Sequence, residues 1–307
     1  MNISIVVNPY ARKNFNNPKL IDNFRDIIGK KGSVKFSQNL DDLESLIREI
    51  KKESPEYIGI SGGDGTLMHT ISRIIRVYED KKIPPILILK GGTMNMVANS
   101  LKLKGSQLAT LERFYLAYNK NIKTEKRDLI NINNYYCFIF GMGIVSNFLS
   151  TYYDGPGTGP VKAAQVTGKL IGSAVVDGPY SRKMLDPIKL KLEINNESFP
   201  EMEVTAILSQ TIENLGIGFK PMYRAMEKEG TFHSYITTLK INKILKFILP
   251  IFFGTPIRDK GFIDKLTYKM KIEGNKTFNY TLDGELFESE TSNLILKHGK
   301  TLNFVVV

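Results

Sequence analysis

Residues 60–67 read Ile-Ser-Gly-Gly-Asp-Gly-Thr-Leu, and they form the most informative stretch of the chain. The apolar run 57–60 leads into this stretch, and apolar side chains follow it with helical spacing at positions 67, 71, 74 and 75. The pattern predicts a buried strand, a tight glycine turn and a helix that begins near Leu67. Because the first N–H groups of a helix have no partner inside the helix, such a turn can hold a phosphate group.

The carboxylate of Asp64 indicates that a metal ion accompanies the phosphate. An aspartate in the turn would repel phosphate unless Mg²⁺ lies between the two, so the combination favours a nucleotide bound together with Mg²⁺. The alternative is an ordinary strand-to-helix turn without a ligand. A bare Gly-Gly pair would fit that alternative, whereas Gly-Gly-Asp-Gly-Thr as a unit favours phosphate binding.

The first part of the chain alternates between strand and helix patterns. Strands are expected at 3–7, 33–37, 57–60 and 85–89, and helices at about 18–29, 41–52, 67–79 and 106–119. Such alternation predicts a Rossmann-like parallel sheet flanked by helices, a nucleotide-binding α/β domain over residues 1–126. Asn8, Gly62 and Gly91 each follow a predicted strand, so their loops are expected at one edge of the sheet.

The remainder, residues 127–307, is expected to form a mostly β, sandwich-like domain for a lipid substrate. β-Rich segments separated by Asn, Gly and Pro turns occur at 128–140, 188–195, 202–209, 232–238, 265–273 and 277–283. One helix is expected inside this domain at about 160–176. The pattern leaves open that the last strand returns to the first domain.

Composition limits the class of protein. The 307 residues contain 42% hydrophobic and 24% charged side chains, which is ordinary for a globular protein of two domains. Cys137 is the single cysteine, so a disulfide within the chain and a cysteine metal cluster are excluded. We find neither a signal-peptide pattern nor an apolar run of about 18 residues, and therefore expect a soluble cytoplasmic protein, with peripheral contact to the inner membrane face left open.

The formal net charge of +11 calls for an anionic partner, and residues 240–276 carry nine Lys or Arg against three acidic residues. Ile241, Ile244, Leu245 and Ile248 have helical spacing in the same segment. The first interpretation is a helix that faces the core and keeps its lysines in water. The second is docking to an anionic lipid surface, which suits basic residues beside apolar ones better than nucleic acid does.

Further motifs accompany the glycine turn. Asn-Pro-Tyr-Ala-Arg-Lys at 8–13 offers an amide and a cation, and Gly-Gly-Thr-Met-Asn at 91–95 offers flexible backbone, a hydroxyl and an amide. Asp-Gly-Glu at 283–285 places two carboxylates around a glycine. In this order, over nearly the whole chain, the motifs resemble the diacylglycerol kinase catalytic-domain family, which includes bacterial lipid kinases and the sphingosine and ceramide kinases.

The resemblance implies a two-domain, ATP-dependent lipid kinase with Mg²⁺, acting between the domains on the hydroxyl of diacylglycerol or a related glycerolipid or sphingoid base. It implies Glu285 as proton acceptor, with Asp283 and Asp64 as the other catalytic carboxylates. Asp64 and, in a second-domain motif, Glu229 are the implied metal ligands. The implied nucleotide-binding residues are Asn8, Lys13, Ser37, Gly62, Gly63, Asp64, Gly65, Thr66, Gly92, Thr93 and Asn95.

The chain departs from the family pattern at Met68, His69 and Met96, where polar or acidic residues are common, and at Glu229, where Asp is usual. These departures motivate a second hypothesis, a catalytically weak regulator that binds nucleotide or lipid. A third is a kinase for a soluble substrate, of the NAD kinase type, because that class shares the Gly-Gly-Asp-Gly-Thr motif. A nucleic-acid partner ranks last, since it explains none of the glycine motifs. The sequence does not determine the oligomeric state, and a homodimer is left open.

Overall fold

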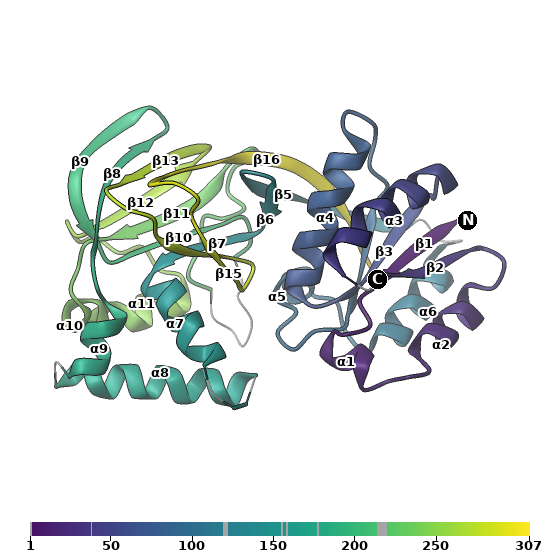
Figure 1. Ribbon diagram of the computed structural model, residues 1–307, viewed down its shortest axis with the longest axis horizontal. Helices are drawn as coiled ribbons and strands as arrows, with labels where there is room; N and C mark the ends of the chain where they lie inside the picture. Colours follow the sequence, from purple (N-terminus) through teal and green to yellow (C-terminus); the bar gives the residue numbers. More distant parts are fainter. Residues whose placement is uncertain are drawn as a thin grey trace. The chain divides into compact units, whose positions relative to one another are not determined.

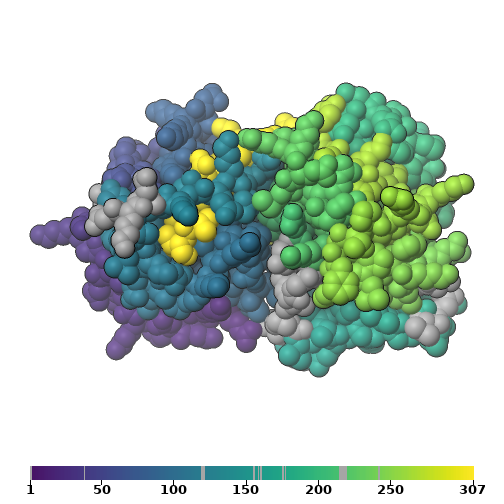
Figure 2. All heavy atoms as spheres, turned by 180° about the vertical axis from the view of Figure 1, so that it is seen from behind, coloured from purple at the N-terminus to yellow at the C-terminus, as the bar shows by residue number. Residues whose placement is uncertain are grey.

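The computed structural model describes residues 2–37, 39–118, 122–154, 156–157, 159–176, 178–213 and 220–307. The chain forms two compact units, the first made of residues 1–127 and 301–307 and the second of residues 128–300 (Figure 1). The last residues of the chain, coloured yellow, lie among the blue and teal atoms of the first unit in Figure 2. The first unit is therefore built from two separate stretches of sequence.

A parallel sheet forms the centre of the first unit. Its strands are β1 (Ile3–Val7), β2 (Gly32–Phe36), β3 (Tyr57–Gly62), β4 (Ile86–Lys90) and the end of β16 (Asn293–Val306). They lie in the order β2-β1-β3-β4-β16, and each pairs in parallel with its neighbour. The carboxyl ends of these strands therefore lie at one edge of the sheet.

Helices flank this sheet. They are α1 (Arg12–Phe15), α2 (Leu20–Ile28), α3 (Leu40–Glu53), α4 (Asp64–Tyr78), α5 (Met96–Ser100) and α6 (Gln107–Tyr118). Alternate β1 residues Ile3, Ile5 and Val7 pack with Phe24 of α2 and Phe114 of α6 in one buried cluster. The parallel α/β architecture expected from the sequence is confirmed. The last residue of the expected helix 106–119 lies outside the described residues.

Helix α3 shows how local sequence sets an element. The side chain of Asn39 accepts hydrogen bonds from the backbone N–H groups of Asp41 and Asp42, both at 2.9 Å. This cap satisfies two of the donors that a helix start leaves open, and the two acidic residues suit the positive end of the helix dipole. Lys51 and Lys52 lie in the last turn, where cations are favoured.

Helix α4 begins at Asp64, three residues before the expected start at Leu67. Gly63 has an extended backbone (φ −91°, ψ −174°) and is the N-cap, but it has no side chain to accept the first N–H groups. Gly65 and Thr66 thus belong to the first helical turn rather than to a loop. The expectation was wrong because Asp64 is favourable in the first turn of a helix, which outweighs the helix-breaking tendency of the glycine beside it.

The second unit consists largely of antiparallel strands. Over the described residues, one sheet has six strands in the order β12-β11-β10-β7-β14-β15. In the other sheet, β16 is followed by the neighbouring strands β13, β8 and β9. β5 pairs with β16 and β6. The bounds are β5 Lys123–Ile132, β6 Tyr135–Cys137, β7 Ile139–Gly143, β8 Ile188–Ile194, β9 Glu197–Val204, β10 Ala206–Gln210, β11 Phe232–Thr237, β12 Phe262–Thr267, β13 Lys269–Gly274, β14 Asn279–Leu282 and β15 Glu285–Glu288. The mostly β character expected of this part is confirmed, and its sheets are largely antiparallel.

The β-rich segment 265–273 contains parts of two strands, because the chain turns at Tyr268. The side chain of Asn195 accepts hydrogen bonds from the backbone N–H groups of Tyr268 (2.9 Å) and Lys269 (3.3 Å). β12 therefore ends in one sheet and β13 begins in the other. A side chain more than seventy residues earlier causes the break, so the local pattern of the segment could not show it.

The helices of the second unit lie together on one side of its strands (Figure 1). They are α7 (Ile144–Tyr153), α8 (Pro160–Val175), α9 (Pro179–Met184), α10 (Ile241–Ile244), the 3₁₀ turn η1 (Leu245–Phe247) and α11 (Ile248–Phe253). The helix expected at 160–176 is thus observed, as α8. Across the described part of the chain, no helix combines the length and the apolar character that crossing a bilayer requires.

Candidate active site

Three loops meet at the carboxyl edge of the parallel sheet. The backbone N–H of Asn8, after β1, donates to the carbonyl oxygen of Ser61 in β3 at 2.9 Å. The N–H groups of Gly91 and Gly92, after β4, both donate to the carbonyl oxygen of Gly62, at 2.9 and 3.0 Å. The N–H of Lys13 donates to the carbonyl of Gly91 at 2.9 Å. The motifs at 8–13, 62–66 and 91–95 thus form one assembly, as the strand order requires.

The glycines are needed because two backbones lie against each other. A Cβ on Gly92 would stand 2.4 Å from the Cα of Gly63, and a Cβ on Gly62 would stand 2.4 Å from the Cβ of Thr66. Neither position has room for a side chain. The result is a stretch of backbone without side chains at the start of α4, which is the geometry that lets a phosphate approach main-chain N–H groups.

Asn8 joins the first loop to the first turn of α4. Its side-chain Nδ2 donates to the hydroxyl of Thr66 at 2.8 Å, and its Oδ1 accepts from the backbone N–H of Tyr10 at 2.9 Å. Both ends of the amide are therefore committed inside the protein. Asn8 fixes the orientation of the Thr66 hydroxyl, and it can act on a bound nucleotide through that hydroxyl.

Asp64 connects the glycine turn to the loop after β4. Its Oδ1 accepts a hydrogen bond from the backbone N–H of Val97 at 3.3 Å. Burial raises the pKa of Asp64 from 3.8 to about 6, and hydrogen bonds from the backbone of Met96, Val97 and Asn95 oppose the rise. The carboxyl is thus close to its titration point near neutral pH. A positive charge beside it would favour the ionised form.

Asn95 organises its own loop. It has a left-handed backbone (φ 50°), its Oδ1 accepts from the N–H of Gly92 at 3.0 Å, and its Nδ2 donates to the carbonyl of Gly92 at 2.8 Å. The expected amide is therefore used to shape the Gly92 turn. Thr93, between them, is exposed and presents its side chain at the surface of the loop.

A group of cations lies beside these loops. Lys90, at the end of β4, donates from Nζ to the carbonyl of Leu103 at 2.8 Å. Partial burial lowers the pKa of Lys90, and the charges of Lys13 and Arg113 lower it further. Lys13 and Arg113 thus both act on the charge of Lys90, and a bound phosphate would offset this repulsion. Lys13 was expected from the sequence, whereas Lys90 and Arg113 were not.

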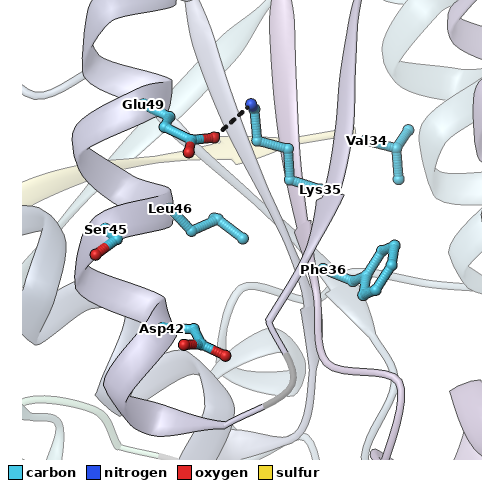
Figure 3. A pocket seen from close by; sticks show the side chains of 7 residues that line it. All are labelled: Val34, Lys35, Phe36, Asp42, Ser45, Leu46 and Glu49. Atoms are coloured by element: carbon cyan, nitrogen blue, oxygen red, sulfur yellow. Dashed lines mark hydrogen bonds and ion pairs between the residues drawn. The ribbon is translucent and has the colours of Figure 1, made fainter.

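Ser37 follows β2 at the same edge, and its hydroxyl donates to the carbonyl of Asn39. Beside it, a surface groove of about 410 Å³ runs between β2 and α3 (Figure 3). The groove is lined by Val34, Lys35, Phe36, Asp42, Ser45, Leu46 and Glu49. Lys35 already pairs with Glu49 (3.0 Å) and Glu53 (2.9 Å), so the charges in this groove do not favour a triphosphate.

A buried polar network beneath the loops was missed by the sequence analysis. Asn14 donates from Nδ2 to the carbonyl of Asn8 (2.7 Å) and to the hydroxyl of Ser61 (3.0 Å). Its Oδ1 accepts from Nε2 of Gln107 at 2.8 Å, and the Ser61 hydroxyl donates to Oε1 of Gln107 at 2.5 Å. The three side chains are buried. They tie the first loop, β3 and α6 together directly under the candidate phosphate site.

We expect Asn14→Ala to lower the free energy of unfolding by about 2–4 kcal/mol, because it leaves buried partners without hydrogen bonds. The affinity for ADP should fall as well, since the loop at 8–13 loses its anchor. Urea unfolding and calorimetric titration of ADP measure the two effects. Asn16→Ala, at an exposed position two residues along, is the matched control and should change neither. Unchanged ADP affinity in a destabilised Asn14→Ala would show that the network does not position the site.

In the second unit, Asp283 is a buried structural carboxylate. Its Oδ1 accepts from the backbone N–H groups of Phe138 (2.9 Å) and Ile139 (2.8 Å), and its Oδ2 lies 3.2 Å from the N–H of Phe138. The backbone N–H of Asp283 donates to the carbonyl of Ile139 at 3.0 Å. Asp283 therefore holds the turn after β14 against the start of β7.

Glu285 presents a different environment two residues later. The residue is exposed, and partial loss of hydration raises the pKa of its carboxyl above the ordinary value. The hydroxyl of Tyr153, in α7, donates to the carbonyl of Gly284 at 2.9 Å and fixes the turn from the other side. The turn is thus rigid, and of its two carboxylates Glu285 is the one on the surface.

Glu229, the second candidate metal ligand, is exposed in the turn that follows Met226. The N–H of the next residue, Gly230, donates to Oδ2 of Asp128 at 3.0 Å, and Oδ1 of Asp128 lies 3.1 Å from Nε2 of His298. The carboxylates of Asp128 and Glu229 thus belong to neighbouring segments. Glu229 remains a proposed ligand.

The donor set suits Mg²⁺ that arrives with a nucleotide. No group of three or more His, Cys, Asp or Glu side chains in the described ranges could hold a metal ion by itself. Mg²⁺ is commonly bound by one or two carboxylates together with substrate phosphates and water. Asp64 beside the backbone cradle fits that arrangement, so the residues present are compatible with ATP and Mg²⁺ as a pair.

Two departures from the family pattern have local explanations. Met68 is fully buried on the inner face of α4, so its side chain contributes to the core. Burial, helped by the charge of Arg73, lowers the pKa of His69 to about 4. His69 is therefore uncharged near neutral pH, with its Nδ1 3.1 Å from a guanidinium nitrogen of Arg73. Neither residue supplies a negative charge to the loop edge.

Comparisons with known proteins agree with this geometry. Residues 2–126 match the family model of the diacylglycerol kinase catalytic domain. The chain resembles a candidate diacylglycerol kinase from Bacillus anthracis str. Sterne (TM-score 0.73, 14% identity, covering 100% of this chain and 97% of that one). It also resembles a diacylglycerol kinase structure from the same organism (TM-score 0.67, 15% identity, covering 100% and 98%). At these identities the likeness concerns the fold. No curated protein sequence matches the chain.

Proposed function

Because residues 2–126 belong to the diacylglycerol kinase catalytic-domain family, we propose that the protein is an ATP-dependent lipid kinase. It transfers the γ-phosphoryl group of ATP to the hydroxyl of a membrane lipid alcohol, diacylglycerol or a related glycerolipid or sphingoid base. The observation that carries the proposal is the backbone without side chains at Gly62, Gly63 and Gly92, where a Cβ on Gly62 or Gly92 would stand only 2.4 Å from a neighbouring atom. The first turn of α4 beside three cations suits a polyphosphate.

Phosphoryl transfer needs mainly the positioning of the reactants and the neutralisation of phosphate charge. When bound, ATP with Mg²⁺ supplies the phosphoryl group and part of that neutralisation. The first turn of α4 binds phosphate oxygens through main-chain N–H groups, and Lys13, Lys90 and Arg113 offset their charge. The carboxylate of Asp64 would bind the Mg²⁺ that accompanies the nucleotide. Glu285 accepts the proton of the lipid hydroxyl, which its surface position and raised pKa support.

The direct test uses ATP labelled in the γ-phosphate, Mg²⁺ and a mixed lipid extract, followed by chromatography of the labelled lipids. We expect one labelled lipid class that is absent without Mg²⁺. ATP binding without transfer to any lipid would instead identify a nucleotide-binding regulator. Label on NAD in a reaction without lipid would identify a kinase for a soluble substrate.

Asp64→Asn separates the catalytic from the structural contribution of this carboxylate. We expect the label transfer to fall by at least about 10–100-fold, since metal affinity depends on the charge. Because burial raises the pKa of Asp64 to about 6, the folded protein binds protons more tightly than the unfolded chain. Wild-type stability should therefore fall as the pH rises from about 4 to about 6, and the variant should lack this loss.

Urea unfolding of both proteins at pH 4 and pH 7 checks the stability part. The neutral amide can still accept the hydrogen bond from Val97, so the variant should be at least as stable as the wild type at pH 7. A variant that keeps full activity would remove Asp64 from the metal-binding role. One that unfolds at pH 7 would show that the charge itself supports the loop.

A further inference from the structure

The helical run α10–η1–α11 carries an apolar surface that the second unit leaves open. Its last ten residues, 244–253, read Ile-Leu-Lys-Phe-Ile-Leu-Pro-Ile-Phe-Phe. Every residue of η1 and α11 is described, and none of them is buried. Leu249 is 67% exposed and Phe253 is 66% exposed. Exposed leucine and phenylalanine on one short helix mark an interaction surface rather than a core element.

The run is anchored on one side and open on the other. Leu245 packs against the cluster formed with α8 and α9, and the ring of Phe247 meets Phe262 of β12 edge to face, with centroids 5.4 Å apart. The backbone N–H of Lys220 donates to the carbonyl of Phe252 at 3.0 Å. Leu249 and Phe253 are four residues apart and therefore share the opposite, outer face of α11.

The end of α11 fixes this orientation. Gly254 terminates the helix in a left-handed conformation (φ 65°, ψ 48°), and a Cβ there would stand 2.2 Å from the carbonyl oxygen of Lys220. Only glycine allows the chain to pass so close to Lys220 in this conformation. Phe253 is therefore held at the last position of α11 with its ring outward.

Cations flank the apolar residues in the sequence. Lys240, Lys243 and Lys246 precede α11 and Arg258 and Lys260 follow it, all of them exposed, against the single acidic residue Asp259. Residues near 250, yellow-green in Figure 2, form part of the outer surface of this unit. Lysines beside outward leucine and phenylalanine match an anionic bilayer, where the apolar groups enter the interface and the cations meet phosphate headgroups.

We propose that α10–η1–α11 is the membrane-docking element of this protein, with Leu249 and Phe253 inserting into an anionic lipid surface. This inference rests on the proposed function, because it supplies the contact through which a kinase would reach a lipid substrate. It takes up the second of the two interpretations that the sequence left open for this segment, while Leu245 packs inward as the first one expects. The basic residues act as the electrostatic part of the contact.

The test measures sedimentation of the full chain with vesicles of phosphatidylcholine alone or with phosphatidylglycerol added. The wild type should bind the mixed vesicles and bind pure phosphatidylcholine much less. Leu249→Ser combined with Phe253→Ser should weaken binding by at least about tenfold, since each large apolar side chain lost from the interface costs that order of affinity. Lys243→Gln combined with Lys246→Gln should weaken it by about fivefold per lysine in low salt.

Leu116→Ser is the matched control, because Leu116 on α6 is 75% exposed but lies in the other unit. It should bind vesicles as the wild type does. Equal binding by all these proteins, or no binding by the wild type, would overturn the docking proposal. The proposal would also fail if the Leu249→Ser and Phe253→Ser changes converted a dimer to a monomer in analytical ultracentrifugation, since a second copy would then cover this surface.

Activity on a short-chain diacylglycerol, dissolved below its micelle concentration, separates the two proposals. The Leu249→Ser and Phe253→Ser variant should phosphorylate this soluble substrate like the wild type and lose activity on vesicles. Vesicle binding without any kinase activity would leave the docking surface in place and defeat the proposed function. Kinase activity without vesicle binding would support the proposed function and defeat the docking proposal.

Discussion

Glu285→Gln is expected to lower the turnover of the lipid substrate by roughly 10²–10⁴-fold, the usual contribution of a general base. Glutamine keeps the size of the side chain but cannot accept the proton. The residue is exposed at the start of β15, so the fold should be unaffected. Steady-state kinetics with vesicles or soluble short-chain lipid measures the loss, and circular dichroism confirms the folded state.

The pH profile gives a second readout for the same residue. Loss of hydration raises the pKa of Glu285, and a base must be ionised, so wild-type turnover should fall as the pH drops through that pKa. The residual activity of the variant should lack this acidic limb. Glu288→Gln, at the other end of β15 and also exposed, is the control and should retain full turnover. Full activity in Glu285→Gln would assign the proton to another group.

Asp283→Ala should behave in the opposite way and damage the fold. It removes the acceptor for the backbone N–H groups of Phe138 and Ile139, both in a buried region. At about 1–3 kcal/mol for each unsatisfied group, we expect a loss of roughly 2–6 kcal/mol in the free energy of unfolding. Thermal or urea unfolding measures it directly.

Asp283→Asn is the informative partner variant. Its amide oxygen can still accept one of the two N–H groups, so the loss of stability should be clearly smaller than in Asp283→Ala. If Asp283→Ala kept wild-type stability and lost only turnover, the carboxylate would have a chemical role instead. Compared with Glu285→Gln, the two Asp283 variants test whether one carboxylate supports the turn while the other acts on the substrate.

The loop edge of the first unit could be predicted because its determinants are local. Each glycine motif follows directly after an apolar strand, and parallel strands bring their carboxyl ends together without help from distant residues. The predicted strand at 3–7 and the helix at 41–52 agree closely with β1 and α3 for the same reason. Local pattern and final environment coincide in this half of the chain.

Features that depend on residues far apart in the sequence could not be predicted. Gln107 meets Asn14 across 93 residues, and nothing near either residue marks the contact. The sequence also could not show the structural contacts of Asp283, because the N–H groups that donate to its carboxylate belong to residues more than a hundred positions earlier. The segment 240–276 kept two interpretations for a similar reason, since apolar spacing alone does not tell which side of a helix will be covered.

Strand β16 has a consequence for how the protein is made. Residues 301–307 belong to the first unit, although residues 128–300 are synthesised before them. During translation the edge of β4 that pairs with β16 therefore stays unpaired until residues 128–300 have been synthesised. An unpaired edge strand can pair with other chains, so the nascent protein is prone to aggregation during this interval. Rapid folding of residues 128–300 would shorten that interval, so completion of the first unit depends on how fast the second unit folds.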